Sequence, residues 1–159
     1  MKLQKSKYKK QKFSTFVQKI STMNTFDKLK LGDSYTDTRV VTEEMINTFA
    51  AVSGDSNPLH LDADFAATTP FKERIAHGAL VSSFISKVLG CDFPGYGSVY
   101  VSQFSQFKRP VKIGDEISTT VEVKEKDERR GYVTFKTYCK NQLGKIVVDG
   151  EAVGIPPKQ

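Results

Sequence analysis

The chain has 159 residues, of which 38% are hydrophobic and 26% are charged, and it includes 11 Gly and 6 Pro. This length fits one compact globular domain, and this composition excludes a collagen-like chain and a wholly disordered one. The net charge of +6 is confined to the N-terminal end, because residues 1–22 contain seven lysines and no acidic residue and leave 17 basic against 18 acidic residues in the rest.

Residues 1–25 are predicted to form a basic extension before a single domain over residues 26–159. The extension has no Gly or Pro and no sustained apolar period, which favours a mobile, solvated tail. Three alternatives remain open for it: an organelle-targeting peptide, a helix on a membrane surface, or an arm that binds nucleic acid. A fourth is that the protein starts at Met23. No apolar stretch of signal-peptide type follows the lysines, so we expect a cytoplasmic protein, or one of the mitochondrial matrix if the extension is a transit peptide.

A first strand is predicted around residues 38–41, where β-branched residues are frequent, and a helix is predicted over residues 43–52. Thr42 is a suitable N-cap residue for this helix, and Ser53-Gly54 is a suitable end. A loop containing Pro58 then leads to a short helical turn over residues 62–67.

A second helix is predicted from about His77 to Leu89, with Gly90 as its C-terminal stop. Its apolar residues cover a wide face, so we expect it to be buried. Residues 76–89 form the longest mainly apolar stretch, but they contain three serines and a lysine and fall short of the roughly 20 residues that a membrane span needs. The buried face consists of Leu80, Val81, Phe84, Ile85, Val88 and Leu89.

Four further strands are predicted over residues 99–107, 116–126, 132–140 and 145–155. In the second of them Ile117, Thr119, Val121 and Val123 alternate with polar residues, which is typical of a half-buried strand. The short connections at residues 127–131 and 141–144 favour an antiparallel meander. The predicted fold class is therefore α+β, with a curved antiparallel sheet around one buried helix.

The densest group of polar side chains is the sequence SGDSNPLHLD at residues 53–62. Asp55 and His60 are five residues apart, and a turn at Gly54 and Pro58 brings their side chains together. A carboxylate and an imidazole in one place can transfer protons and hold a water molecule between them. Asn57 has an amide that can orient either partner. In the alternative interpretation, these polar side chains only satisfy backbone groups of the loop.

Metal binding is a weaker interpretation of the same residues. A calcium loop that starts at Asp55 would need Gly at its sixth position, which holds His60. A site built from His60, Asp62 and His77 has no standard ligand spacing. Cys91 and Cys139 also lack zinc-site spacing and are too few for a disulfide scaffold.

A second motif, RIAHG at residues 74–78, lies where the buried helix is predicted to begin. Backbone N–H groups at a helix start are free to bind an anion, and Gly78 would let an oxygen approach them closely. An oxyanion on a thioester carbonyl would be stabilised there. In the alternative interpretation, Gly78 only permits a tight capping turn.

A third motif, FKRPVKIGD at residues 107–115, joins two predicted strands. Its simplest interpretation is a hairpin that carries basic side chains. Alternatively, Lys108, Arg109 and Lys112 attract the phosphates of a bulky acyl carrier.

These three motifs, in this order and within one domain, resemble the MaoC-like family of R-specific (type 2) enoyl-CoA hydratases and 3-hydroxyacyl-thioester dehydratases. The resemblance covers residues 29–155. It implies a hot-dog fold, a homodimer and a tunnel for the acyl chain. It also implies a lyase that adds water reversibly to trans-2-enoyl thioesters of CoA or acyl carrier protein, giving R-3-hydroxyacyl thioesters. No metal or redox cofactor, no nucleic acid and no stable membrane insertion is implied.

The resemblance also assigns roles to individual residues. Asp55 and His60 match the catalytic pair, Asn57 an orienting residue, and Gly78 the oxyanion donor through its backbone N–H. We expect the substrate-binding residues to be His77, Ala79, Lys108 and Arg109. Ala79 stands where relatives often have Met, and Gln106 where a basic residue is common, so pocket shape and chain length stay open. The alternative function is another hot-dog activity, either a thioesterase or a non-catalytic acyl-CoA-binding module.

Overall fold

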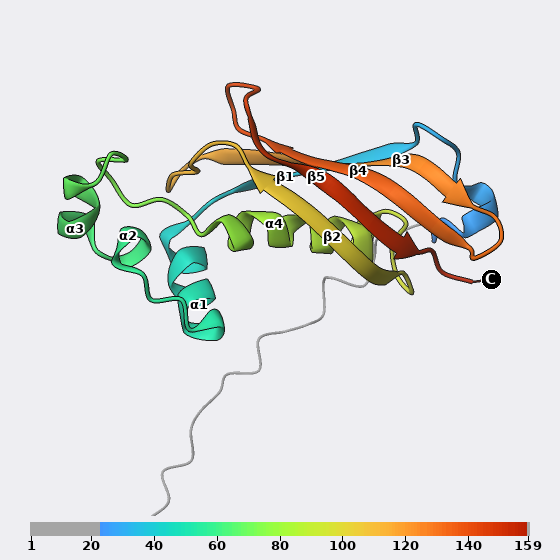
Figure 1. The fold of residues 1–159 in the computed structure, drawn as a ribbon, viewed down its shortest axis with the longest axis horizontal. Coiled ribbons are helices and arrows are strands. Elements are labelled where there is room, and N and C mark those ends of the chain that lie inside the picture. The colour runs from blue at the N-terminus through green and yellow to red at the C-terminus, as the bar shows by residue number, and fades with distance from the viewer. Residues whose placement is uncertain (1–22, 159) are drawn as a thin grey trace, which may run out of the picture.

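The computed structural model describes residues 23–158, so most of the predicted basic extension lies outside the described residues. Figure 1 shows a sheet with one helix, α4, along one of its faces and the helices α1, α2 and α3 gathered beyond one end of the sheet. Among the described residues, no helix is long and apolar enough to cross a membrane. The elements are η1 (Phe26–Lys28), β1 (Ser34–Val40), α1 (Glu43–Ser53), α2 (Pro58–Leu61), α3 (Ala63–Thr68), α4 (Gly78–Lys87), η2 (Val88–Asp92), β2 (Val99–Phe107), β3 (Glu116–Asp127), β4 (Tyr132–Lys140) and β5 (Ile146–Ile155).

The five strands form one antiparallel sheet in the order β1-β3-β4-β5-β2. The predicted meander is confirmed for β3, β4 and β5. The hairpin interpretation of residues 107–115 is wrong, because β2 pairs with β5 and β3 pairs with β1 and β4. The segment between β2 and β3 is held instead by the residues before α4, where the Ala76 N–H donates to the Val111 carbonyl at 2.7 Å and Ile75 bridges to Lys112.

The core lies between α4 with η2 and the face of the sheet that they cover. Buried residues alternate with more exposed ones along β4, and Phe135 at its centre is fully buried. All six apolar residues predicted for the buried helix face are less than 9% exposed. Apolar burial of this kind contributes about 25 cal/mol per Å².

The first helical segment confirms its predicted capping. Thr42 accepts a hydrogen bond from the Met45 N–H at 3.2 Å, and Gly54 ends α1 in the left-handed region with φ +78°. The expected loop at Pro58 is wrong, because Pro58 is the first residue of α2 and Asn57 caps that helix. Proline fits the first helical position, where its missing N–H would have no partner in the helix.

The predicted end of the buried helix at Gly90 is also wrong. α4 continues directly into η2, a π-helical segment that includes Gly90 and ends at Asp92. Gly90 does not have a positive φ, so it does not reverse the chain direction. The helical segment stops before Phe93, which has extended backbone and precedes Pro94, because proline disfavours helical backbone in the residue that precedes it.

Candidate active site

The loop between α1 and α2 carries Asp55 on a short, hydrogen-bonded turn. The Asp55 N–H donates to Ser53 Oγ at 3.2 Å, and Asp55 Oδ1 accepts a hydrogen bond from the Asn57 N–H at 3.3 Å. The Asp55 side chain is 51% exposed. The carboxylate is therefore held by its own loop and remains accessible.

His60 lies in α2 and is buried. Its Nδ1 is 2.7 Å from the carbonyl oxygen of Ile75. Because a carbonyl can only accept, Nδ1 carries the proton in this contact, and Nε2 of the neutral ring has a free lone pair. A histidine held in this way can accept a proton through Nε2.

The folded chain brings Asp55, His60 and His77 together. One carboxylate oxygen of Asp55 and one ring nitrogen of each histidine lie within 4.8 Å of one another. A water molecule with hydrogen bonds of about 2.7–3.0 Å on each side can bridge such a separation. The structure thus places the two residues of the expected catalytic pair side by side, while their chemical roles stay predictions.

Asn57 touches Asp55 through its backbone and not through its side chain. Its Oδ1 accepts from the Leu59 N–H at 3.0 Å and caps α2. Asp62, a possible metal ligand at the sequence level, instead accepts from the Phe65 N–H at 2.9 Å and caps α3. Both side chains therefore hold helix starts, and Asn57 orients the Asp55 carboxylate through its N–H.

The Asp55, His60 and His77 group also has the residue types of a metal site. The three donor atoms lie within 4.8 Å of one another, and His60 and His77 each place one ring nitrogen against a backbone carbonyl. Because a carboxylate and an imidazole can transfer protons without an ion, we derive no chemistry through a metal.

Gly78 is the first residue of α4, and among the described residues no side chain caps this helix. The first backbone N–H groups of a helix have no partner within it and face an anion with the positive end of the helix dipole. A Cβ built at position 78 would lie 2.9 Å from the Phe107 ring. Glycine at position 78 therefore allows the Phe107 ring to pack closely and is also suited to oxygen approach.

A cavity of about 420 Å³ opens at this end of α4. Of the expected site residues, it is lined by His60, Gly78, Ala79, Lys108 and Arg109. Asp55, Asn57 and His77 are not among the described residues that line it. Arg109 Nη1 also donates to the Ile146 carbonyl at 2.6 Å.

Comparison with known proteins identifies the family. Residues 29–142 match the family described as MaoC like domain. The chain belongs to the MaoC-like family. An (R)-specific enoyl-CoA hydratase of Rhodospirillum rubrum is 44% identical over 135 residues, covering 85% of this chain and 93% of that protein. A mitochondrial 3-hydroxyacyl-[acyl-carrier-protein] dehydratase of Arabidopsis thaliana is 43% identical over 132 residues, covering 81% and 78% of the two chains.

The solved structures agree with this assignment. An unliganded R-hydratase of Pseudomonas aeruginosa superimposes with a TM-score of 0.80 at 44% identity, covering 86% of this MaoC-like chain and 87% of that one. The expected α+β hot-dog fold is confirmed by this match.

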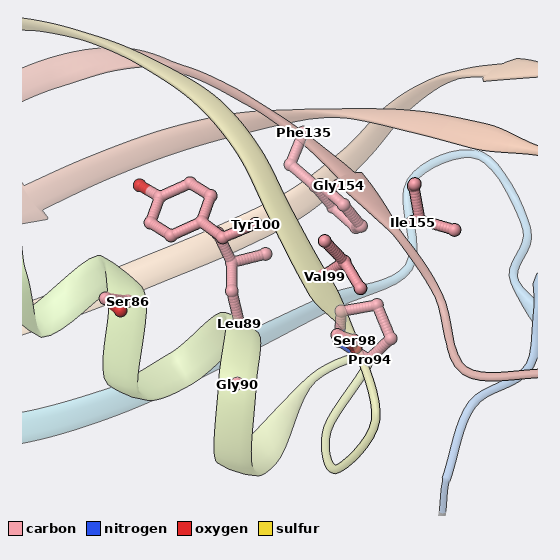
Figure 2. Close-up of a pocket in the computed structure, with 10 residues that line it drawn as sticks. All are labelled: Ser86, Leu89, Gly90, Pro94, Ser98, Val99, Tyr100, Phe135, Gly154 and Ile155. Carbon is pink, nitrogen blue, oxygen red and sulfur yellow. The ribbon is translucent and has the colours of Figure 1, made fainter.

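A second, narrower cavity of the MaoC-like domain lies near the other end of α4. Figure 2 shows this slot, of about 180 Å³, between the helix side with Ser86, Leu89 and Gly90 and the strand side with Tyr100 and Phe135. Most of its lining is apolar or small. Burial raises the pKa of the Tyr100 hydroxyl to about 12, so this phenol stays neutral.

Three features of this MaoC-like site were not predicted from the sequence. They are the stacking of His77 on His60, the packing of Phe107 over Gly78, and the slot beside Phe135. The histidines are in different motifs, and Phe107 lies on a strand that follows α4, so spacing along the chain carries no signal for these contacts.

Proposed function

We propose that this chain catalyses the reversible addition of water to trans-2-enoyl thioesters to give R-3-hydroxyacyl thioesters. The observation that carries the proposal is the Asp55–His60 pair beside a cavity that reaches the free N-terminus of α4. The hydratase and dehydratase names of the relatives describe the two directions of this one reaction.

The reaction follows from the positions of these groups. A water molecule held by Asp55 and His60 loses a proton to one of them as its oxygen bonds to C3 of the substrate. The electrons of the C2–C3 double bond move toward the thioester carbonyl, whose oxygen becomes enolate-like and accepts a hydrogen bond from the Gly78 N–H. The pair then delivers a proton to C2. Dehydration runs through the same steps in reverse.

Lys108 and Arg109 are proposed to bind the carrier of the acyl group, because both line the mouth of the same cavity. Their positive charge suits the phosphates of CoA and the phosphopantetheine of acyl carrier protein. Lys112, the third basic residue of this motif, forms an ion pair with Glu73 at 2.5 Å. We therefore assign carrier binding to the first two cations alone.

The acyl chain is proposed to run along α4 toward the slot of Figure 2. Ser86 is eight residues beyond Gly78, or about 12 Å along the helix axis at 1.5 Å per residue. The slot is thus within reach of a medium-length chain whose thioester lies at Gly78. Its small, mostly apolar lining suits methylene groups.

Replacing Gly154 with Val is expected to shorten the preferred acyl chain. Gly154 lines the slot, and a Cβ at this position would lie 3.4 Å from Phe135 Cε2 and from the Val99 carbonyl oxygen, so the larger valine side chain should reduce the space for the chain. We expect turnover of dodecenoyl-CoA to fall about tenfold and that of crotonyl-CoA to stay within a factor of two. An equal loss for both substrates would exclude the slot as the chain-binding site.

A homodimer is proposed from the edge of the sheet. β2 is an edge strand, and Val99, Val101 and Phe104 on it are 45–61% exposed. An exposed apolar edge strand is a favourable surface for pairing with a second copy. Light scattering of the full chain should give twice the monomer mass, and Val101→Lys should shift it toward the monomer.

The compartment is proposed to be the cytoplasm, or the mitochondrial matrix if residues 1–25 act as a transit peptide. That segment is also proposed to be the basic extension of a single domain over residues 26–159. Fusing a fluorescent protein after residue 25 tests the transit peptide. Mitochondrial fluorescence would show that the segment is sufficient for import, and cytoplasmic fluorescence would exclude it as a transit peptide.

The function itself is tested by following the ultraviolet absorbance of crotonyl-CoA with the full chain. Loss of the enoyl absorbance, with a product oxidised by an R-specific 3-hydroxyacyl dehydrogenase, is the expected result. Release of free thiol without loss of enoyl absorbance would instead identify a thioesterase. If neither the enoyl absorbance nor the free thiol changes, the chain is a non-catalytic binding module.

A further inference from the structure

The His77 ring packs against two other rings. Its centroid lies 3.8 Å from that of His60, with an interplanar angle of 35°, and 5.0 Å from that of Phe49. The residue is only 2% exposed, whereas the Asp55 side chain is 51% exposed. Substrate binding, the role expected for it from the sequence, would require access that this ring lacks.

The same ring is hydrogen bonded to the backbone of Asp55. His77 Nε2 lies 3.0 Å from the Asp55 carbonyl oxygen. Because the carbonyl can only accept, Nε2 carries the proton in this contact. The Asp55 carboxylate is further away, with Oδ2 at 4.0 Å from Nε2. His77 thus holds the residue that bears the carboxylate and leaves the carboxylate itself available.

The stacking contact acts on the second member of the pair. The His60 ring is fixed at its edge by the Ile75 carbonyl and on one face by His77. A single buried side chain therefore contacts both Asp55 and His60, which come from different parts of the α1–α2 segment. His77 is itself the N-cap residue of α4, so its position is tied to that of the Gly78 N–H.

We propose that His77 is a positioning residue, which sets the separation between the Asp55 carboxylate and the His60 imidazole and does not touch the substrate. This proposal rests on the proposed function, because the separation matters only if the two groups act together. A displacement of about 1 Å at a catalytic group can lower the rate by about 10²-fold. Loss of the His77 hydrogen bond is therefore expected to lower kcat and leave KM nearly unchanged.

The test compares His77→Gln with His77→Asn in the full chain. Both variants remove the stacked ring and keep an amide, but the glutamine nitrogen reaches the position of Nε2 and the asparagine nitrogen does not. We expect kcat for crotonyl-CoA to fall about 10²-fold in His77→Asn. The kcat of His77→Gln should be about tenfold higher than that of His77→Asn. KM should stay within about twofold of the wild-type value in both variants. Ile46→Val, at a fully buried position of α1, controls for a general loss of stability.

Two results would overturn the positioning role. One is a raised KM with an unchanged kcat, which would mean that His77 contacts the substrate. The other is an equal kcat in the two amide variants. Nitrogen NMR of the wild-type imidazoles gives a readout that does not depend on activity, since His77 must be an Nε2–H tautomer with a slowly exchanging proton. An Nδ1–H tautomer would refute the proposal, whereas an inactive wild type would refute only the proposed function.

Discussion

Asp55→Asn and His60→Gln are each expected to lower kcat for crotonyl-CoA hydration by about 10²–10⁴-fold, the usual contribution of a general acid or base. Each substitution keeps a side chain of similar shape but removes the group that takes or returns a proton. The Asp55 side chain is half exposed and its hydrogen bond from the Asn57 N–H is local, so Asp55→Asn should unfold at nearly the wild-type temperature. The measurement is the initial rate of enoyl absorbance loss, with thermal unfolding followed in parallel.

Asp62→Asn is the matched control for Asp55→Asn. Asp62 belongs to the same motif, but its carboxylate caps α3, and asparagine is an equally good N-cap residue. Asp62→Asn is therefore expected to have the wild-type kcat.

The double variant Asp55→Asn/His60→Gln should be little slower than either single variant, because the two groups act as a unit. Wild-type turnover in either single variant would disprove the assigned pair.

Phe135→Ala is expected to lower the free energy of unfolding by about 3–5 kcal/mol, the range for a buried phenylalanine. Phe135 is fully buried at the centre of β4. Its ring packs edge-on against the ring of Phe93, and the two ring centroids are 6.3 Å apart. The substitution removes apolar contacts and enlarges the slot that Phe135 lines. Urea unfolding of the full chain, at one fixed protein concentration, measures the change.

The control for this stability prediction is Leu143→Ala. Leu143 is 73% exposed in the turn between β4 and β5, so its removal should change the unfolding free energy by no more than about 0.5 kcal/mol. A loss below 1 kcal/mol in Phe135→Ala would mean that the core collapses around the gap, and the slot would then not be a rigid cavity.

The role of Gly78 could not be decided from the sequence motif alone. The motif permits two interpretations, close approach of a ligand oxygen and tight packing of the chain. The structure gives direct evidence of the second, because a Cβ at this position would meet Phe107 at 2.9 Å. The first is compatible with it, since the N–H group and the Cα hydrogens point in different directions. One glycine can therefore serve both roles.

The sequence by itself determined the local structure and the chemical inventory of the site. Alternation along β3 and β4, the helical period of α4 and the Thr42 cap are each decided by residues close together in the chain. The same holds for the motif with Asp55 and His60, whose turn is short. The end of α4 was predicted wrongly at Gly90, because a glycine outside the left-handed region does not stop a helix.

Only the tertiary structure decided which segments meet. It placed β2 beside β5, which the short-hairpin interpretation missed because pairing between distant strands depends on the whole sheet. It also stacked His77 on His60 and set Phe107 over Gly78, bringing together side chains from α2, the start of α4 and the end of β2. Such contacts depend on how α4 lies across the sheet, and no period or spacing within one segment encodes that geometry.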